Sequence, residues 1–95
     1  MRSYELMYIL SANLDEAAVP EIIAKFEEII TAGAGEIEKT EQLGKRRLAY
    51  EIDGMREGFY VLSNFKCPVE TAQELERIMK ITDGVVRYLL VKVEE

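Results

Sequence analysis

Apolar residues recur along this chain with two different spacings, and their order predicts six elements. A spacing of two, typical of strands, runs through residues 4–10, 36–52, 59–67 and 85–93. A spacing of three and four, typical of amphipathic helices, runs through residues 16–32 and 70–81. The predicted order is therefore strand, helix, strand, strand, helix, strand.

Turn-forming residues flank the first helix. Asn13 or Asp15 can accept hydrogen bonds from the exposed backbone N–H groups at its start. Gly33 and Gly35 predict its end, because glycine commonly follows the last helical turn.

The segment 36–52 is long for one strand, and its apolar pattern changes phase. Leu43 is odd-numbered, whereas Leu48 and Tyr50 are even-numbered. One extra residue reverses which face the following side chains occupy, so we predict a β-bulge at Gly44. A turn that opens at 53–54 and closes by Gly58 is expected to lead into the next strand.

This order fits two β-α-β units with right-handed crossovers, which place both helices on one face of the sheet. We therefore expect a ferredoxin-like α+β sandwich, with a four-stranded antiparallel sheet whose other face is free. A chain of 95 residues allows one such domain, spanning residues 1–95.

Composition narrows the possible functions. The 18 acidic and 12 basic residues give a net charge of −6, which argues against diffuse binding to nucleic acid. Any such contact must be focal or shared with a more basic partner. The chain has no histidine and one cysteine, so we expect no metal, no cofactor and no enzymatic activity. The absence of a signal-like or membrane-spanning apolar run predicts a cytoplasmic protein.

Three consecutive cations, Lys45-Arg46-Arg47, stand out against this acidic background. They can contact phosphates, or they can protect an edge strand from aggregation, and charge alone does not decide between these roles. The further basic candidates are Arg2, Arg56, Arg87 and Lys92. In the ferredoxin-like order the first and last strands are antiparallel neighbours, which places Arg2 nearer to Lys92 than to Arg87.

Apolar side chains are also expected on the face without helices. Together they would form a patch larger than a monomer normally leaves bare, which predicts a protein interface, with cover by a loop as the alternative. The residues are Met7, Ile9, Tyr60 and Leu62. Tyr4 and Tyr8 are expected on the helix-facing side instead, and Cys67 is expected in the core.

Several motifs resemble those of the bacterial small-subunit ribosomal protein S-six family. The most specific is Glu-x-x-Gly-Lys-Arg-Arg-Leu-Ala-Tyr at 41–50. The others are Met-Arg-x-Tyr-Glu at 1–5, Asn-Leu-Asp at 13–15, Gly-Phe-Tyr at 58–60 and Val-Val-Arg-Tyr-Leu-Leu-Val at 85–91. Together they cover essentially the whole chain.

The resemblance implies a structural protein that binds the central domain of small-subunit ribosomal RNA together with ribosomal protein S-eighteen. A basic partner would explain how an acidic protein can sit on RNA. The expected RNA-binding residues are Arg2, Lys45, Arg46, Arg47, Arg87 and Lys92. The expected partner-binding residues are Met7, Ile9, Tyr50, Arg56, Tyr60 and Leu62.

Two other classes of function use the same fold. One is a homodimeric regulatory module that senses a small molecule, although the chain lacks a glycine-rich ligand loop. The other is a phosphate-ester or acyl-phosphate hydrolase, which would need a paired motif of the type that Arg2 and Asn64 do not form. Both rank below the ribosomal interpretation.

Overall fold

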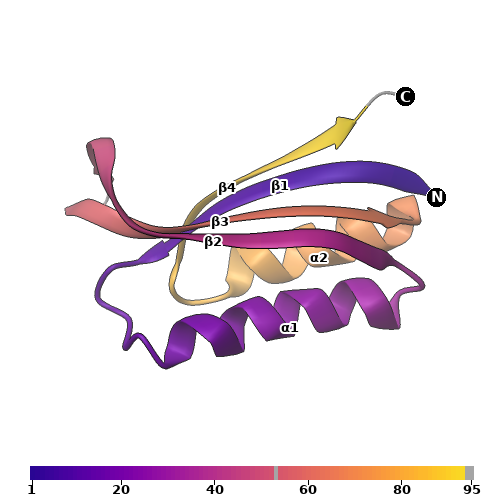
Figure 1. The fold of residues 1–95 in the computed structure, drawn as a ribbon, viewed down its shortest axis with the longest axis horizontal. Coiled ribbons are helices and arrows are strands. Elements are labelled where there is room, and N and C mark those ends of the chain that lie inside the picture. The colour runs from indigo at the N-terminus through magenta and orange to yellow at the C-terminus, as the bar shows by residue number, and fades with distance from the viewer. Residues whose placement is uncertain (53, 94–95) are drawn as a thin grey trace.

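The computed structural model describes residues 1–52 and 54–93 as an antiparallel sheet with two helices packed on one face (Figure 1). The sheet order is β2-β3-β1-β4, which confirms the predicted ferredoxin-like topology. The elements are β1 (Arg2–Ser11), α1 (Ala18–Ala32), β2 (Glu36–Ile52), β3 (Met55–Cys67), α2 (Val69–Ile81) and β4 (Val85–Val93).

The core lies between the sheet and the helices. Four alternate residues of β1 point into it, Tyr4, Leu6, Tyr8 and Leu10, which confirms the predicted placement of the first two tyrosines. Tyr8 meets the ring of Phe26 edge-on at 5.4 Å between centroids, and Tyr4 stacks on Phe65 at 5.7 Å. Cys67 is fully buried, as predicted, and its burial raises the pKa of the thiol.

Both ends of α1 are set by local contacts. At its start Asp15 Oδ1 accepts from the backbone N–H of Ala17 at 3.2 Å. At its end Ala34, with a φ of 68°, takes the left-handed position where a glycine was expected. The neighbouring glycines are needed for close packing instead: a Cβ on Gly33 would lie 2.5 Å from Thr71 Oγ1, and one on Gly35 would lie 2.7 Å from Ile30 Cγ2.

The strand β3 begins at Met55, four residues earlier than predicted. Gly58 therefore lies within the strand, opposite Ser11, and does not close a turn. A Cβ on Gly58 would come within 2.4 Å of Ile9 Cγ2, so the missing side chain leaves room for Ile9 on the neighbouring strand. Asp53, the first residue of the predicted turn, lies outside the described residues.

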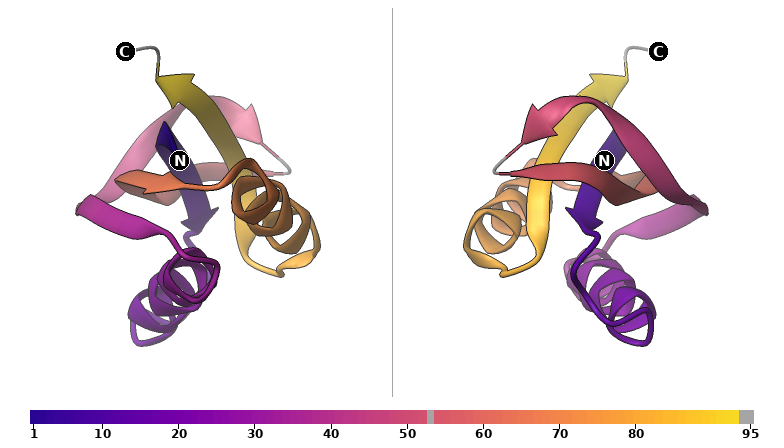
Figure 2. Two further views of the ribbon diagram at one scale, coloured as in Figure 1. Left: turned by 90° about the vertical axis from the view of Figure 1, so that its right-hand side faces the viewer. Right: turned by 90° about the vertical axis from the view of Figure 1, so that its left-hand side faces the viewer.

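The strand β2 is irregular where its apolar pattern changes phase. Its register with β3 shifts between Gln42 and Gly44, and Gly44 has a φ of 83°, which confirms the predicted bulge. Two further register shifts, which the sequence did not indicate, lie at 37–39 and 47–52. They accompany a pronounced curl of the β2–β3 hairpin away from the helices (Figures 1 and 2).

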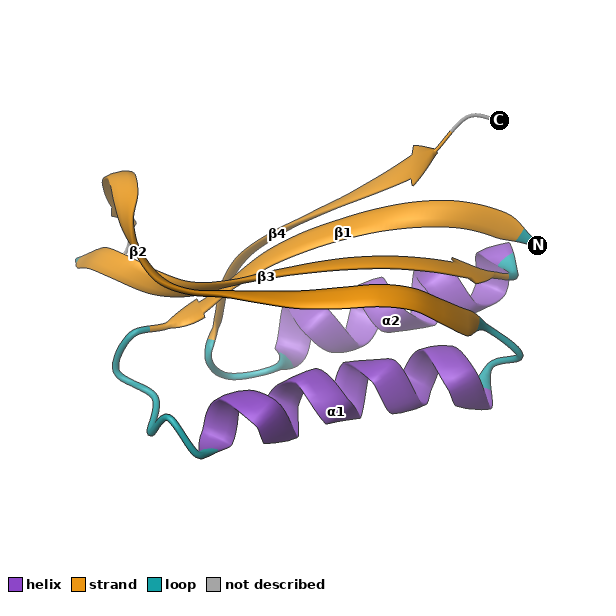
Figure 3. Ribbon diagram, viewed as in Figure 1, coloured by secondary structure: helices purple, strands orange, loops and turns teal. Residues whose placement is uncertain are grey.

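This curl corrects the prediction that the second face of the sheet is free. The end of β2 folds over that face, so Leu48 retains only 8 % exposure and Ile9 only 5 %. Loops are confined to the two ends of the sheet (Figure 3). In the described part of the chain, neither α1 nor α2 is long and apolar enough to cross a membrane.

Candidate interaction surface

Charge is divided between the two layers of the molecule. The four strands carry nine of the 12 cationic residues and six acidic ones. The two helices carry three cationic and six acidic residues. The sheet is therefore positive on balance, whereas the helical layer is negative, and this places the anion-binding potential of the chain on the strands.

The basic block Lys45-Arg46-Arg47 follows the bulge of β2, at the edge of the sheet, and all three side chains are exposed. Lys45 Nζ lies 3.9 Å from Glu57 Oε2 and 5.9 Å from the centroid of the Phe59 ring. Arg46 Nε donates to the backbone carbonyl of Leu43 at 3.0 Å. Exposed ion pairs of this kind are weak, so a phosphate can replace Glu57 as the partner of Lys45.

The sequence did not indicate the acidic residues that accompany these cations. Glu57 lies opposite Arg47 in the register of β2 and β3. Farther along the hairpin Arg56 Nε lies 3.6 Å from Glu51 Oε2. Both glutamates approach the cations only because β2 and β3 pair with each other. The register of these two strands, if known, would have identified both glutamates. Their negative charges partly offset the positive charge of the hairpin.

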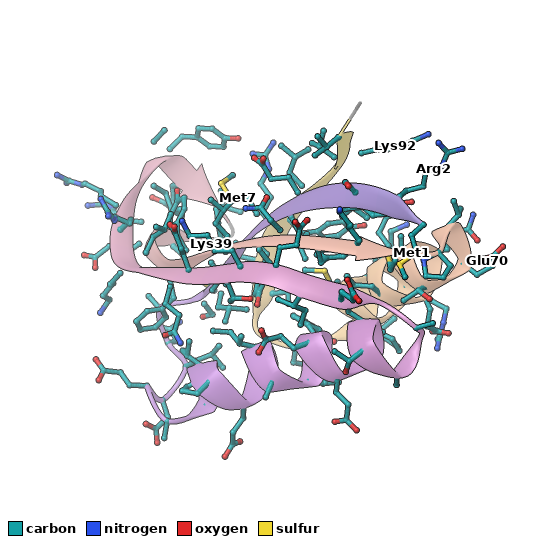
Figure 4. All side chains as sticks on the ribbon, turned by 45° about the vertical axis from the view of Figure 1, so that its right-hand side comes forward. Met1, Arg2, Met7, Lys39, Glu70 and Lys92 are labelled. Atoms are coloured by element: carbon teal, nitrogen blue, oxygen red, sulfur yellow. The ribbon has the colours of Figure 1, made fainter. Side chains whose placement is uncertain are left out.

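Arg2 and Lys92 lie together at the other end of the sheet (Figure 4). Lys92 pairs in register with Tyr4, which confirms that Arg2 lies near this end of β4. Lys45 pairs with Phe59, which pairs with Leu10 of β1. Leu10 lies six residues after Tyr4, so the basic block and Lys92 are separated by roughly 20 Å along the strands, at about 3.4 Å per residue. The predicted RNA-binding residues therefore do not form one patch.

The curl of the hairpin forms one side of a partly open pocket of about 220 Å³ on the face of the sheet that lacks helices. We call it the hairpin pocket, and it is lined by Met7, Ile9, Leu48, Ala49, Tyr50, Ile52, Tyr60, Arg87, Tyr88 and Leu89. Four of the predicted partner-binding residues line it. The other two do not: Leu62 lies beside it, opposite Met7, and Arg56 lies out on the hairpin.

Arg87 lines the hairpin pocket and does not lie next to the other predicted RNA-binding residues. It pairs in register with Ile9, and its Nη1 donates to the hydroxyl of Tyr50, which joins β4 to the curled end of β2. Among the described residues, no carboxylate forms an ion pair with Arg87. Its guanidinium keeps further N–H donors for a ligand.

The sequence analysis missed an exposed apolar stripe along β4. Leu89, Val91 and Val93 retain 56, 47 and 41 % of their exposure on the face without helices. The sequence did contain a signal of this stripe, because the last strand is apolar on both of its faces. An edge strand with one solvated face usually alternates between apolar and polar residues. This stripe starts at the hairpin pocket and extends it along the edge of the sheet.

Comparisons with known proteins agree on one family. Residues 3–92 match the family model described as "Ribosomal protein S6". The chain is 53 % identical to the "Small ribosomal subunit protein bS6" of Halalkalibacterium halodurans, and 50 % identical to that of Thermoanaerobacter pseudethanolicus, over 100 % of both chains in each case. The crystal structure of 30S ribosomal protein S6 from Thermotoga maritima superposes with a TM-score of 0.91 at 32 % identity, covering 97 % of this chain and 87 % of that one.

Proposed function

This chain belongs to the ribosomal protein S-six family and is a constituent of the small ribosomal subunit in the cytoplasm, and we propose that it binds the central domain of small-subunit ribosomal RNA jointly with ribosomal protein S-eighteen. Its role is that of a scaffold without catalysis. Joint binding fits its charge, because a protein with a net charge of −6 supplies few phosphate contacts of its own.

The basic block on the edge of β2 is the observation that carries this proposal. Lys45, Arg46 and Arg47 are exposed next to one another on a strand whose other edge is paired to β3. A paired strand holds the three cations in place before RNA arrives, which lowers the entropy cost of the contact. Arg2 and Lys92 provide a second, smaller contact at the far end of the sheet.

Replacement of Lys45, Arg46 and Arg47 by alanine tests the RNA contact. We expect the triple variant to fold normally but to bind a central-domain RNA fragment, in the presence of ribosomal protein S-eighteen, much more weakly than the wild type. Each lost phosphate contact lowers the slope of log K against log salt by about 0.7–0.9, so the loss of three reduces it by about 2–3. Filter binding across a salt series measures both quantities.

The helices offer a matched control. Replacement of Lys25, Arg77 and Lys80 by alanine removes the same charge from the exposed face of α1 and α2. Two of these residues face nearby glutamates, as Lys45 does. We expect this variant to keep nearly the wild-type slope. Equal losses in both triple variants would show that net charge, and not the basic block, governs binding.

A further inference from the structure

The strand β4 is an open edge of the sheet. It pairs only with β1, in continuous register from Ser3↔Val93 to Ile9↔Arg87. The outer side of such a strand presents unpaired backbone N–H and C=O groups to solvent. A bulge would bend the edge away from an incoming strand, but the described stretch 87–93 contains none. Its backbone can therefore accept another antiparallel strand.

The exposed side chains of this edge complement those of a second copy. Leu89, Val91 and Val93 are exposed on the face without helices. If two copies pair antiparallel with Leu90 opposite Leu90, the two stretches 87–93 overlap completely. Leu89 then lies opposite Val91 of the second copy, and residues so placed have Cβ atoms roughly 4.5–5.5 Å apart, close enough to pack. The apolar stripe of each copy is thereby covered by the stripe of the other.

The same register keeps like charges apart. Arg87 lies opposite Val93 of the second copy, and Lys92 lies opposite Tyr88, whose ring attracts an ammonium group. The two Lys92 residues are four positions apart along the strands, roughly 14 Å, and the two Arg87 residues are six positions apart, roughly 20 Å. Both separations exceed the Debye length of about 8 Å at physiological salt. Arg87 and Lys92 themselves lie on opposite faces of the sheet.

We propose that two copies of the free protein associate through β4, with Leu90 at the twofold axis, and join their sheets into one of eight strands. Assembly stops there, because both remaining edges are β2, which is protected by register shifts and by the basic block. The inference is independent of the proposed function, since it uses neither RNA nor another protein. Pairing of two short edges buries less than the about 1,600 Å² of a standard interface, so the dimer is weak and reversible.

Sedimentation velocity of the full chain tests the dimer. The weight-average mass of the wild type should rise from that of one chain towards that of two between about 10 µM and about 1 mM. A wild type that stays monomeric throughout overturns the inference.

A single charge on the edge locates the interface. Leu89→Glu places a carboxylate opposite Val91 of the second copy and should raise the dissociation constant at least about tenfold. Ile81→Glu is the matched control, because Ile81 is 68 % exposed on α2, and it should dimerise within about twofold of the wild type. An unchanged dimer in Leu89→Glu, or an equal loss in Ile81→Glu, overturns β4 as the interface. Circular dichroism confirms that each variant is folded.

A mixture of two variants tests the register. Leu89→Glu and Val91→Lys should each stay monomeric alone. In an equimolar mixture the introduced carboxylate of one chain lies opposite the introduced ammonium of the other, so dimers should return to within about threefold of the wild-type affinity at low salt.

The control mixture moves the ammonium group by two residues. Val93→Lys replaces Val91→Lys and places the new charge opposite Arg87 of the second copy, so this mixture with Leu89→Glu should stay monomeric. Recovery in the first mixture alone supports pairing about Leu90. Recovery in neither mixture, or equal recovery in both, overturns that register.

Discussion

The two edges of the sheet have opposite characters. The edge strand β2 is 17 residues long, rich in charge and interrupted by three register shifts, one of them at a glycine with a positive φ. The edge strand β4 is nine residues long and pairs in continuous register from Ser3↔Val93 to Ile9↔Arg87. It carries two cations and no acidic residue, and its remaining side chains are apolar or aromatic.

Bulges and charge protect an edge from pairing with other chains, because they bend the strand and make its approach costly. By that criterion β2 is protected and β4 is not. The difference teaches that the two edges offer different chemistry: a charged edge suits phosphates, and an apolar edge suits a protein. Three sets of substitutions can break or sharpen this comparison.

The largest expected effect concerns a leucine on each edge strand. Leu48 on β2 is buried by the curl, whereas Leu89 on β4 is 56 % exposed. Leu48→Ala should lower the free energy of unfolding by about 2–3 kcal/mol, since it removes buried methyl groups. Leu89→Ala should lower it by less than about 0.5 kcal/mol. Urea unfolding followed by circular dichroism measures both, and similar losses would mean that the curl does not distinguish the edges.

A smaller effect is expected at the bulge of β2. Among the described residues, no atom beyond the chain neighbours lies within 4 Å of a Cβ built on Gly44, so its positive φ alone sets the cost of a side chain. Gly44→Ala should lower the free energy of unfolding by about 1–2 kcal/mol. Gly44→Asn should cost less, because asparagine tolerates left-handed backbone. If alanine costs nothing in the same urea experiment, the bulge does not depend on glycine.

The smallest effect is expected from a substitution that adds a charge to β4 and so makes this strand more like β2. Val91 lies directly opposite Glu5 on β1, so Val91→Lys introduces a cross-strand pair of opposite charges. We expect this variant to be more stable than the wild type by about 0.2–0.5 kcal/mol. The same substitution in a Glu5→Gln background is the control, and there the gain should disappear. A gain that survives in that background would have to come from something other than charge.

Part of this architecture was predictable because it depends on local periodicity. The helix-facing stripe of β1 and the change of phase in β2 are visible in the order of the residues, and both the core tyrosines and the bulge at Gly44 follow from them. The topology follows as well, since short connections and right-handed crossovers leave few arrangements of six such elements.

The remaining features depend on twist and on distant contacts, which periodicity does not encode. The curl brings Tyr50 to Arg87 across 37 positions of sequence, a contact that the order of the residues does not reveal. The left-handed Ala34 was missed because the adjacent glycines are required by Thr71, Ile30 and Cys67, residues that reach them only in the folded chain.

The uneven sharing of charge between sheet and helices also affects how the molecule meets its target. Positive strands on one side and negative helices on the other give it an electric dipole that points from the helical layer to the sheet, and the field of a polyanion exerts a torque on such a dipole. We therefore expect an encounter with RNA to begin with the strands facing the RNA and the helices on the far side. A protein whose total charge would repel it from nucleic acid is turned, before contact, so that its attractive side leads.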